Sequence, residues 1–132
     1  MTDEARTTPW TPDELAAVGG AEEIGIASLR GDGTLRPYVT IWVVRAGDEL
    51  YVRSARGPSG SWYRHAVAAG TGRIRAGGLE RDVTFTEPAY SDVDADIDAA
   101  YHAKYDRYGP AIVGPVVGDK ASEVTLRLLP RN

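Results

Sequence analysis

The chain has 132 residues and a formal net charge of −4, with 42% hydrophobic and 26% charged residues. This length fits one compact domain with its own core. The acidic balance argues against general nucleic-acid binding, which favours a broad basic surface. Because there is no cysteine, a disulfide framework and a thiolate metal site are both excluded. We expect a polar segment and helix at 1–22 and a β-rich body at 23–132.

The N-terminal residues 1–11 are polar and acidic and lack the apolar core of a signal peptide. No later run reaches the roughly 18 apolar residues of a membrane span. We therefore expect a soluble, cytoplasmic protein without a membrane or nucleic-acid partner.

A helix is predicted at the start of the domain. Thr11 is a suitable N-cap, Pro12 takes the first helical position, and Glu14 stands three residues after the cap, as in a capping box. Gly19 and Gly20 are expected to end this helix.

Six strands are predicted in the β-rich body. The first three are separated by Gly- and Asp-containing turns typical of an antiparallel meander, and they span 24–30, 35–45 and 50–55. Alternation places Leu50 and Val52 on one face of the third strand, with Tyr51 and Arg53 on the other.

The remaining strands surround two predicted helices. A hairpin spans 73–76 and 79–86, and a last strand carries the alternating Val124, Leu126 and Leu128. A short helix lies before the hairpin and a long one after it. The pattern predicts an α+β fold, a small antiparallel six-stranded barrel with flanking helices.

Positive charge is concentrated in one stretch of this acidic chain. Residues 50–79 contain no Asp or Glu but five arginines, Arg53, Arg56, Arg64, Arg73 and Arg75. Arg73 and Arg75 share one face of their strand. The alternative is that all five are solvated surface residues.

A loop rich in Gly and Ser follows the third strand, with the sequence Arg56-Gly57-Pro58-Ser59-Gly60-Ser61. It leads into the short helix, which Ser59 or Ser61 is expected to cap. Backbone N–H groups, hydroxyls and guanidinium groups that face one space are what a bound phosphate or carboxylate needs. The alternative is that the loop is only a turn.

Aromatic residues on the two helices have two interpretations. Tyr101, Tyr105 and Tyr108 lie along one side of the long helix, where periodicity favours a stripe that faces the core. Alternatively, one hydroxyl lines a ligand cavity and donates a proton to a substrate. Trp62 and Tyr63 are likewise either core residues or a platform for a ligand.

Asp94, Asp98 and His102 are spaced at i, i+4 and i+8 on the long helix, which suits a metal or acid–base trio. Helix-end electrostatics and a surface Asp–His pair explain the same residues. We predict no metal site. No serine has a neighbouring histidine and acid at a spacing that suggests a hydrolytic triad.

The order of these parts resembles the split β-barrel flavin-binding superfamily. The resemblance depends on the strand Leu50-Tyr51-Val52-Arg53-Ser54, the Gly/Ser/Pro loop, the pair Trp62-Tyr63, the short helix and the hairpin. The run Ser54-Ala55-Arg56-Gly57 followed by Trp62-Tyr63 is similar to the cofactor-phosphate loop of the deazaflavin-dependent nitroreductases. From Ile24 to Pro130 the sequence is similar to a bacterial family of unknown function within that superfamily.

The resemblance implies a homodimer that binds FMN or the deazaflavin F420 near the subunit interface and transfers a hydride to a small organic substrate. The implied cofactor-binding residues are Arg53, Ser54, Arg56, Gly57, Ser59, Ser61, Trp62, Arg73 and Arg75. We expect F420 before FMN, because an Arg-, Ala- and Gly-rich composition indicates a GC-rich bacterial genome. Tyr101, Tyr105 and Tyr108 are our candidates for the proton donor.

Two other functions remain open on the sequence. One is a barrel without a cofactor, which binds a phosphorylated or carboxylated molecule or rearranges it in a biosynthetic pathway. The other is a scaffold whose basic loop docks an acidic partner. A small barrel also leaves apolar residues such as Trp42 and Val44 that short helices can hardly cover, which is a second reason to expect a homodimer.

Overall fold

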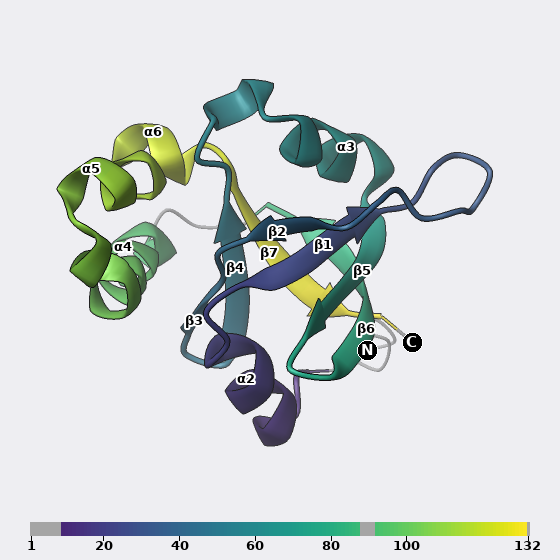
Figure 1. Cartoon of the computed structure of the whole chain (residues 1–132), viewed down its shortest axis with the longest axis horizontal. Coiled ribbons are helices and arrows are strands. Elements are labelled where there is room, and N and C mark those ends of the chain that lie inside the picture. Colours follow the sequence, from purple (N-terminus) through teal and green to yellow (C-terminus); the bar gives the residue numbers. More distant parts are fainter. Residues whose placement is uncertain (1–8, 88–91, 132) are drawn as a thin grey trace.

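The computed structural model describes residues 9–87 and 92–131, so the predicted polar segment at 1–8 lies outside the described residues. One antiparallel sheet of seven strands curls into a half-barrel (Figure 1). Its spatial order is β2-β1-β5-β6-β7-β4-β3. The strands are β1 (Ile24–Ser28), β2 (Val39–Ile41), β3 (Val44–Ala46), β4 (Glu49–Arg53), β5 (Thr71–Ala76), β6 (Leu79–Thr86) and β7 (Thr125–Pro130).

The α+β class and the antiparallel sheet are confirmed, but the predicted number of strands is wrong. The single strand expected at 35–45 is two strands: β2 pairs with β1, and β3 pairs with β4, at opposite edges of the sheet. Trp42 and Val43 connect them. The sequence hides this bend because the residues remain apolar and β-branched while the chain passes from one edge of the sheet to the other.

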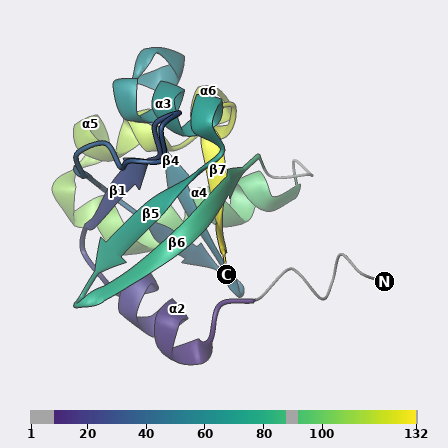
Figure 2. The same cartoon turned by 90° about the vertical axis from the view of Figure 1, so that its right-hand side faces the viewer.

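Helices lie at both ends of the curled sheet and beside it (Figures 1 and 2). The longer ones are α2 (Pro12–Gly19), α3 (Ser61–Ala69) and α4 (Asp92–Tyr105). Short helices and turns complete the chain: η1 (Gly57–Ser59), η2 (Asp106–Tyr108), α5 (Pro110–Val113), η3 (Gly114–Val116) and α6 (Asp119–Ser122). None of the helices in the described ranges is both long enough and apolar enough to cross a membrane.

Helix α2 begins with the predicted capping box. The Glu14 N–H donates to Thr11 Oγ1 (3.1 Å), and the Thr11 N–H donates to Glu14 Oε1 (2.9 Å). The helix ends at Gly19, as expected. Its buried Leu15 and Val18 pack into the core inside the curled sheet.

Two apolar clusters lie on the two faces of β4, as the alternation predicts. Leu50 and Val52 belong to the core inside the sheet, whereas Tyr51 faces outward and packs with Tyr101 and Tyr105 of α4. The expectation of uncovered surface is wrong for Val44, whereas Trp42 is partly covered. Val44 is fully buried, and the Trp42 ring stacks on Tyr105 with centroids 3.9 Å apart, because α4 covers this part of the sheet.

Side chains of α4 also stabilise the bend between β2 and β3. The Val43 N–H donates to the Tyr105 hydroxyl (3.3 Å), and that hydroxyl lies 2.8 Å from the Glu22 carbonyl oxygen and 3.0 Å from that of Val43. Lys104 Nζ donates to the carbonyl oxygens of Val43 (2.7 Å) and Gly19 (2.9 Å). Burial lowers the pKa of Lys104 to about 8. These contacts supply the partners that backbone groups need where the strand ladder is interrupted.

Candidate functional site

The loop after β4 has a backbone shape that depends on two glycines. Ser54 Oγ donates to the Gly57 carbonyl oxygen (2.7 Å), and the Gly57 N–H donates back to the Ser54 carbonyl (3.0 Å). Gly57 has a φ of +69°, which favours glycine. A Cβ on Gly60 would lie 2.6 Å from Ser54 Oγ. Glycine at both positions therefore lets the loop turn tightly into α3.

No side chain caps α3, so the prediction of a serine cap is wrong. Gly60 is the N-cap residue, and the Ser59 hydroxyl instead donates to the Arg56 carbonyl oxygen (3.2 Å). The first N–H groups of a helix have no acceptor within the helix and carry a partial positive charge. This helix end is thus left able to receive an anion.

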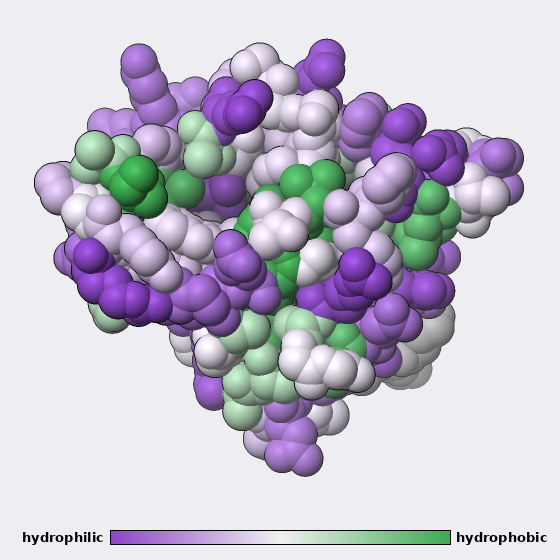
Figure 3. Space-filling model, viewed as in Figure 1, coloured by the Kyte–Doolittle hydropathy of each residue, from purple (hydrophilic) through white to green (hydrophobic). Residues whose placement is uncertain are grey.

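A cleft of about 730 Å³ opens beside this loop. Arg56, Ser59 and Ser61 line it, together with Trp42 and Trp62. Apolar side chains from β2, α5 and η3 complete the walls: Val39, Ile41, Ile112 and Val116. Figure 3 shows apolar surface over β1 and β2 in the middle of this face, with polar residues around it.

Arg53 lies in the wall of the cleft, and its Nε and Nη1 bond to other parts of the protein, whereas its Nη2 has no hydrogen-bond partner among the described residues. The side chain is fully buried and pairs with Asp94 (Nη2–Oδ1 3.7 Å) and Asp98 of α4. Its Nε donates to Thr125 Oγ1 (2.8 Å) and its Nη1 to the Val116 carbonyl oxygen (2.9 Å). Arg53 therefore connects β4 with α4, η3 and β7.

The contacts of Arg53 also separate the candidate metal ligands Asp94 and Asp98 from His102. Asp94 and Asp98 pair with Arg53, whereas His102 Nδ1 lies 2.8 Å from Asp106 Oδ1 on the exposed side of the helix. In 9–87 and 92–131, the structure groups no three Asp, Glu or His side chains in a way that suits a metal ion.

The structure brings most of the predicted anion-binding residues together, but not all of them. Arg56, Ser59, Ser61 and Trp62 line the large cleft, and Ser54 and Gly57 shape its loop. Arg73 and Arg75 lie elsewhere on the sheet. Arg73 pairs with Asp82 of the neighbouring strand (2.7 Å), and Arg75 lines a second cleft.

The three tyrosines of the proton-donor prediction do not line either cleft. Tyr101 is fully buried, and its hydroxyl has no hydrogen-bond partner among the described residues. Tyr105 bonds to backbone at the bend, and the partly exposed Tyr108 bonds to Glu22. Burial raises the pKa of both Tyr101 and Tyr105 above the ordinary value. A structural role therefore explains Tyr105 fully.

Sequence reasoning missed the apolar half of the cleft, which comes from Ile41, Trp42, Ile112 and Val116. These residues come from two parts of the chain that are far apart in the sequence. Nothing local distinguishes them from ordinary core residues. Only the tertiary fold brings them into the lining of one cleft.

Comparison with known proteins finds solved structures whose fold is similar to that of this chain. Solved structures with a similar fold include a putative pyridoxamine 5′-phosphate oxidase from Listeria innocua (TM-score 0.57, 12% identity, covering 89% of this chain and 90% of that chain). The heme storage protein HutZ from Vibrio cholerae is similar over 95% of this chain and 92% of its own (TM-score 0.58, 13% identity). An FAD-binding protein from Mesorhizobium loti matches with a TM-score of 0.51 and 15% identity, over 95% of this chain and 91% of that chain.

At these identities the likeness concerns the fold alone, and it confirms the split-barrel resemblance seen in the sequence. A comparison with curated proteins found no match. The model of one family, described as "Uncharacterized protein conserved in bacteria (DUF2255)", matches residues 14–128. The chain therefore belongs to this bacterial family.

Proposed function

We propose that the large cleft binds the phosphate of a flavin-type cofactor, F420 or FMN, and that the protein is an oxidoreductase that reduces a small organic molecule. One observation carries the proposal: the uncapped end of α3 and the side chains of Arg56, Ser59 and Ser61 border the same cleft as two tryptophan rings. An FAD-binding protein and a putative oxidase among the similar folds support it.

The residues present fit such a cofactor at both ends. Arg56 provides a charge-assisted hydrogen bond to a phosphate, and the two serine hydroxyls and the helix N–H groups provide further donors. The rings of Trp42 and Trp62 and the side chain of Ile41 offer apolar surface to a flat ring system. A volume of about 730 Å³ lies within the usual range of ligand pockets.

In this proposal the bound cofactor supplies the hydride. The chain's own residues bind and orient: the loop fixes the phosphate, the apolar walls exclude water, and Arg53 holds the loop against α4. The composition of the chain favours F420 over FMN and a cytoplasmic location.

A non-redox binding barrel is the second candidate. It is favoured by the lining of the large cleft, in which Thr40, Ser59 and Ser61 are hydroxyl donors but no tyrosine or histidine takes part. An absorbance band above 350 nm that appears when the purified protein is titrated with FMN or F420 separates the two candidates. Phosphate-dependent binding without any flavin-type ligand supports the second.

A tyrosine that donates a proton stays a prediction, because none of the three candidate tyrosines lines the large cleft. Among the three candidates Tyr101 is central in α4, and its hydroxyl is free of other bonds among the described residues. If Tyr101 is the donor, Tyr101→Phe lowers turnover by a factor of about 10² to 10⁴ while cofactor binding persists. Unchanged turnover in Tyr101→Phe, Tyr105→Phe and Tyr108→Phe alike means that water or another group provides the proton.

We further propose that a two-fold homodimer covers the mouth of the large cleft. Val39 and Ile112, which line the cleft, are 41% and 54% exposed, and exposed apolar side chains that gather in one place can mark an interaction surface. Closed two-fold dimers are the commonest assemblies of soluble proteins. Light scattering should give about twice the chain mass of 14.2 kDa. A monomer at every protein concentration tested contradicts the dimer but leaves the cleft proposal intact.

Replacing Arg56 with alanine is expected to weaken binding of FMN or F420 by roughly tenfold or more, because a charge-assisted hydrogen bond is lost. Fluorescence or absorbance titration measures the dissociation constant. Arg64→Ala is the matched control: it removes the same charge from an exposed position on α3 that does not line the cleft. Equal losses in both variants would show that general charge, and not a site, causes the effect.

A further inference from the structure

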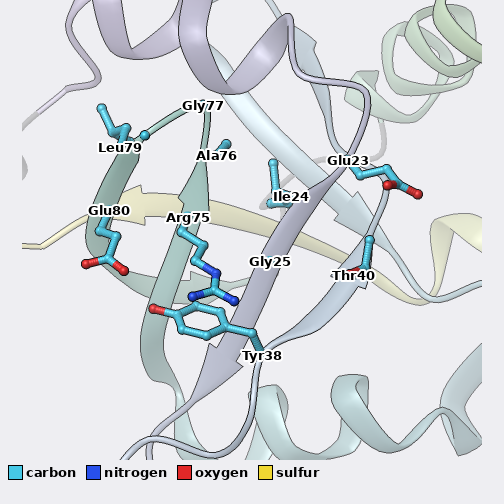
Figure 4. A pocket seen from close by; sticks show the side chains of 11 residues that line it. Glu23, Ile24, Gly25, Tyr38, Thr40, Arg75, Ala76, Gly77, Leu79 and Glu80 are labelled. Atoms are coloured by element: carbon cyan, nitrogen blue, oxygen red, sulfur yellow. The ribbon is translucent and has the colours of Figure 1, made fainter.

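A second cleft, of about 590 Å³, lies on the outer face of the sheet and is shown in Figure 4. It is bordered by β1, by the chain leading into β2 and by the hairpin between β5 and β6. Three ionisable side chains of opposite sign line it: Arg75, Glu23 and Glu80. None of the three forms an ion pair with any residue of 9–87 or 92–131.

Arg75 differs from Arg73, its neighbour on the same face of β5, in how its charge is paired. Arg73 stands opposite Asp82 in the β5–β6 ladder and pairs with it at 2.7 Å. Arg75 stands opposite Glu80 in the same ladder, yet the two side chains do not pair. Both cross-strand positions combine an arginine with an acidic residue, but only Arg73 and Asp82 form an ion pair.

Arg75, which is exposed, stacks on an aromatic ring and does not pair with Glu80. Its guanidinium carbon lies 4.1 Å from the centroid of Tyr38, a cation–π contact that fixes the plane of the group. Gly25, which faces Arg75 across the β1–β5 ladder, makes room for this stack. A Cβ at Gly25 would lie 3.1 Å from the Tyr38 ring and 3.2 Å from Arg75 Cγ.

The stacked guanidinium keeps its hydrogen-bond donors for a ligand. A planar guanidinium presents donors in a fork that suits a carboxylate. Arg75 makes no hydrogen bond to another described residue, and Figure 4 shows it between Glu80 on one side and Glu23 on the other. The turn at the end of the cleft is Gly77-Gly78, which places no side chain over it.

The charges define the ligand class. One guanidinium and two carboxylates give the lining a net negative charge. A dianionic phosphate is therefore repelled, whereas a molecule that carries both signs meets a partner for each group. We propose that this cleft binds a small molecule carrying a carboxylate and an ammonium group, with the carboxylate on Arg75 and the ammonium beside Glu80 or Glu23.

The two clefts share Glu23 and Thr40 in their linings. A ligand bound to Arg75 would therefore lie beside the large cleft, where the cofactor is proposed to bind. We infer from this position that the substrate of the reaction is an amino-carboxylate. This last step depends on the proposed function, whereas binding in the second cleft does not.

The test is a two-dimensional amide NMR titration of the full chain with three probes of matched length: γ-aminobutyrate, butyrate and butylamine. The amides of Gly25, Gly77 and Gly78 report on this second cleft, and the amide of Gly60 reports on the large cleft. We expect γ-aminobutyrate to shift the first three amides with an affinity at least about tenfold above that of either single-charge probe, since each charged contact adds to the other.

Two variants locate the binding. Arg75→Gln should abolish the shifts caused by γ-aminobutyrate, and Arg73→Gln, which removes the same charge two residues away, should leave them unchanged. Equal affinities for γ-aminobutyrate and butyrate, no shift with any probe, or equal losses in both variants overturn the proposal. A separate titration with FMN or F420 that leaves Gly60 unmoved contradicts the proposed function but not this second site.

Discussion

Arg53→Met is expected to lower the free energy of unfolding by about 3 kcal/mol, within the range for breaking a buried ion pair from one side. The variant removes the hydrogen bonds to Thr125 and to the Val116 carbonyl oxygen, and it leaves Asp94 and Asp98 facing an apolar side chain. The two carboxylates are about one-third exposed, so water partly compensates them. Urea unfolding followed by circular dichroism measures the effect.

The matched control for this prediction is Arg73→Met. Arg73 also donates through Nε to a carboxylate, that of Asp82, but both side chains are 40% or more exposed. Exposed pairs contribute about 0 to 1 kcal/mol, so this variant should unfold almost like the parent chain. A loss of similar size in both variants would mean that Arg53 does not hold α4 and η3 to the sheet.

For function, we propose that Arg53 acts on the large cleft mainly through the fold. The sequence analysis predicts that Arg53 binds the phosphate of the cofactor, because Arg53 lies just before the Gly/Ser loop. The structure shows a side chain that already has two carboxylates, a hydroxyl and a carbonyl as partners. In Arg53→Met we therefore expect cofactor affinity to fall in parallel with stability, unlike in Arg56→Ala, where stability should be unchanged.

Tyr105→Phe is expected to cost about 2 kcal/mol of unfolding free energy, the usual penalty for leaving buried backbone groups without a partner. The lost hydroxyl accepts from the Val43 N–H and bonds to the carbonyl oxygens of Glu22 and Val43. Lys104 still donates to the Val43 carbonyl in the variant, but nothing else replaces the partner of the N–H. Thermal and urea unfolding of the variant measure the cost.

Tyr101→Phe is the control, because it deletes a buried hydroxyl from the same face of the same helix. That hydroxyl has no hydrogen-bond partner among the described residues, so its removal should cost little or even stabilise the fold. A stability loss in Tyr101→Phe as large as that in Tyr105→Phe would contradict the role assigned to the bend.

The dependence of stability on pH provides a second test of the burial of Tyr101 and Tyr105. Burial raises the pKa of Tyr101 and of Tyr105 in the fold above the ordinary tyrosine value of 10.0. The unfolded chain therefore releases these phenol protons at a pH where the fold still holds them. Their contribution to stability is complete below pH 10 and is lost as the pH rises above it. Each Tyr→Phe variant should flatten this decline.

The local features of the fold could be predicted from the sequence because neighbouring residues determine them. The capping box of Thr11 and Glu14 forms from residues three apart, and the alternation through β4 assigns Leu50 and Val52 to the inner core. The Gly/Ser loop likewise indicated a tight turn into a helix. For the same reason, the sequence groups Arg56, Ser59 and Ser61, and the structure places all three in the lining of the large cleft. Their binding role stays a prediction.

Only the tertiary structure decided how these parts meet. The run 35–45 becomes two strands because α4, far along the chain, supplies Tyr105 and Lys104 to the backbone of Val43. The five arginines look alike in the sequence. In the fold they differ because their surroundings differ: carboxylates neutralise Arg53 and Arg73, whereas Arg56 and Arg75 line clefts without such a partner among the described residues. A charge is a property of one residue, but its availability to a ligand depends on which distant groups the fold places beside it.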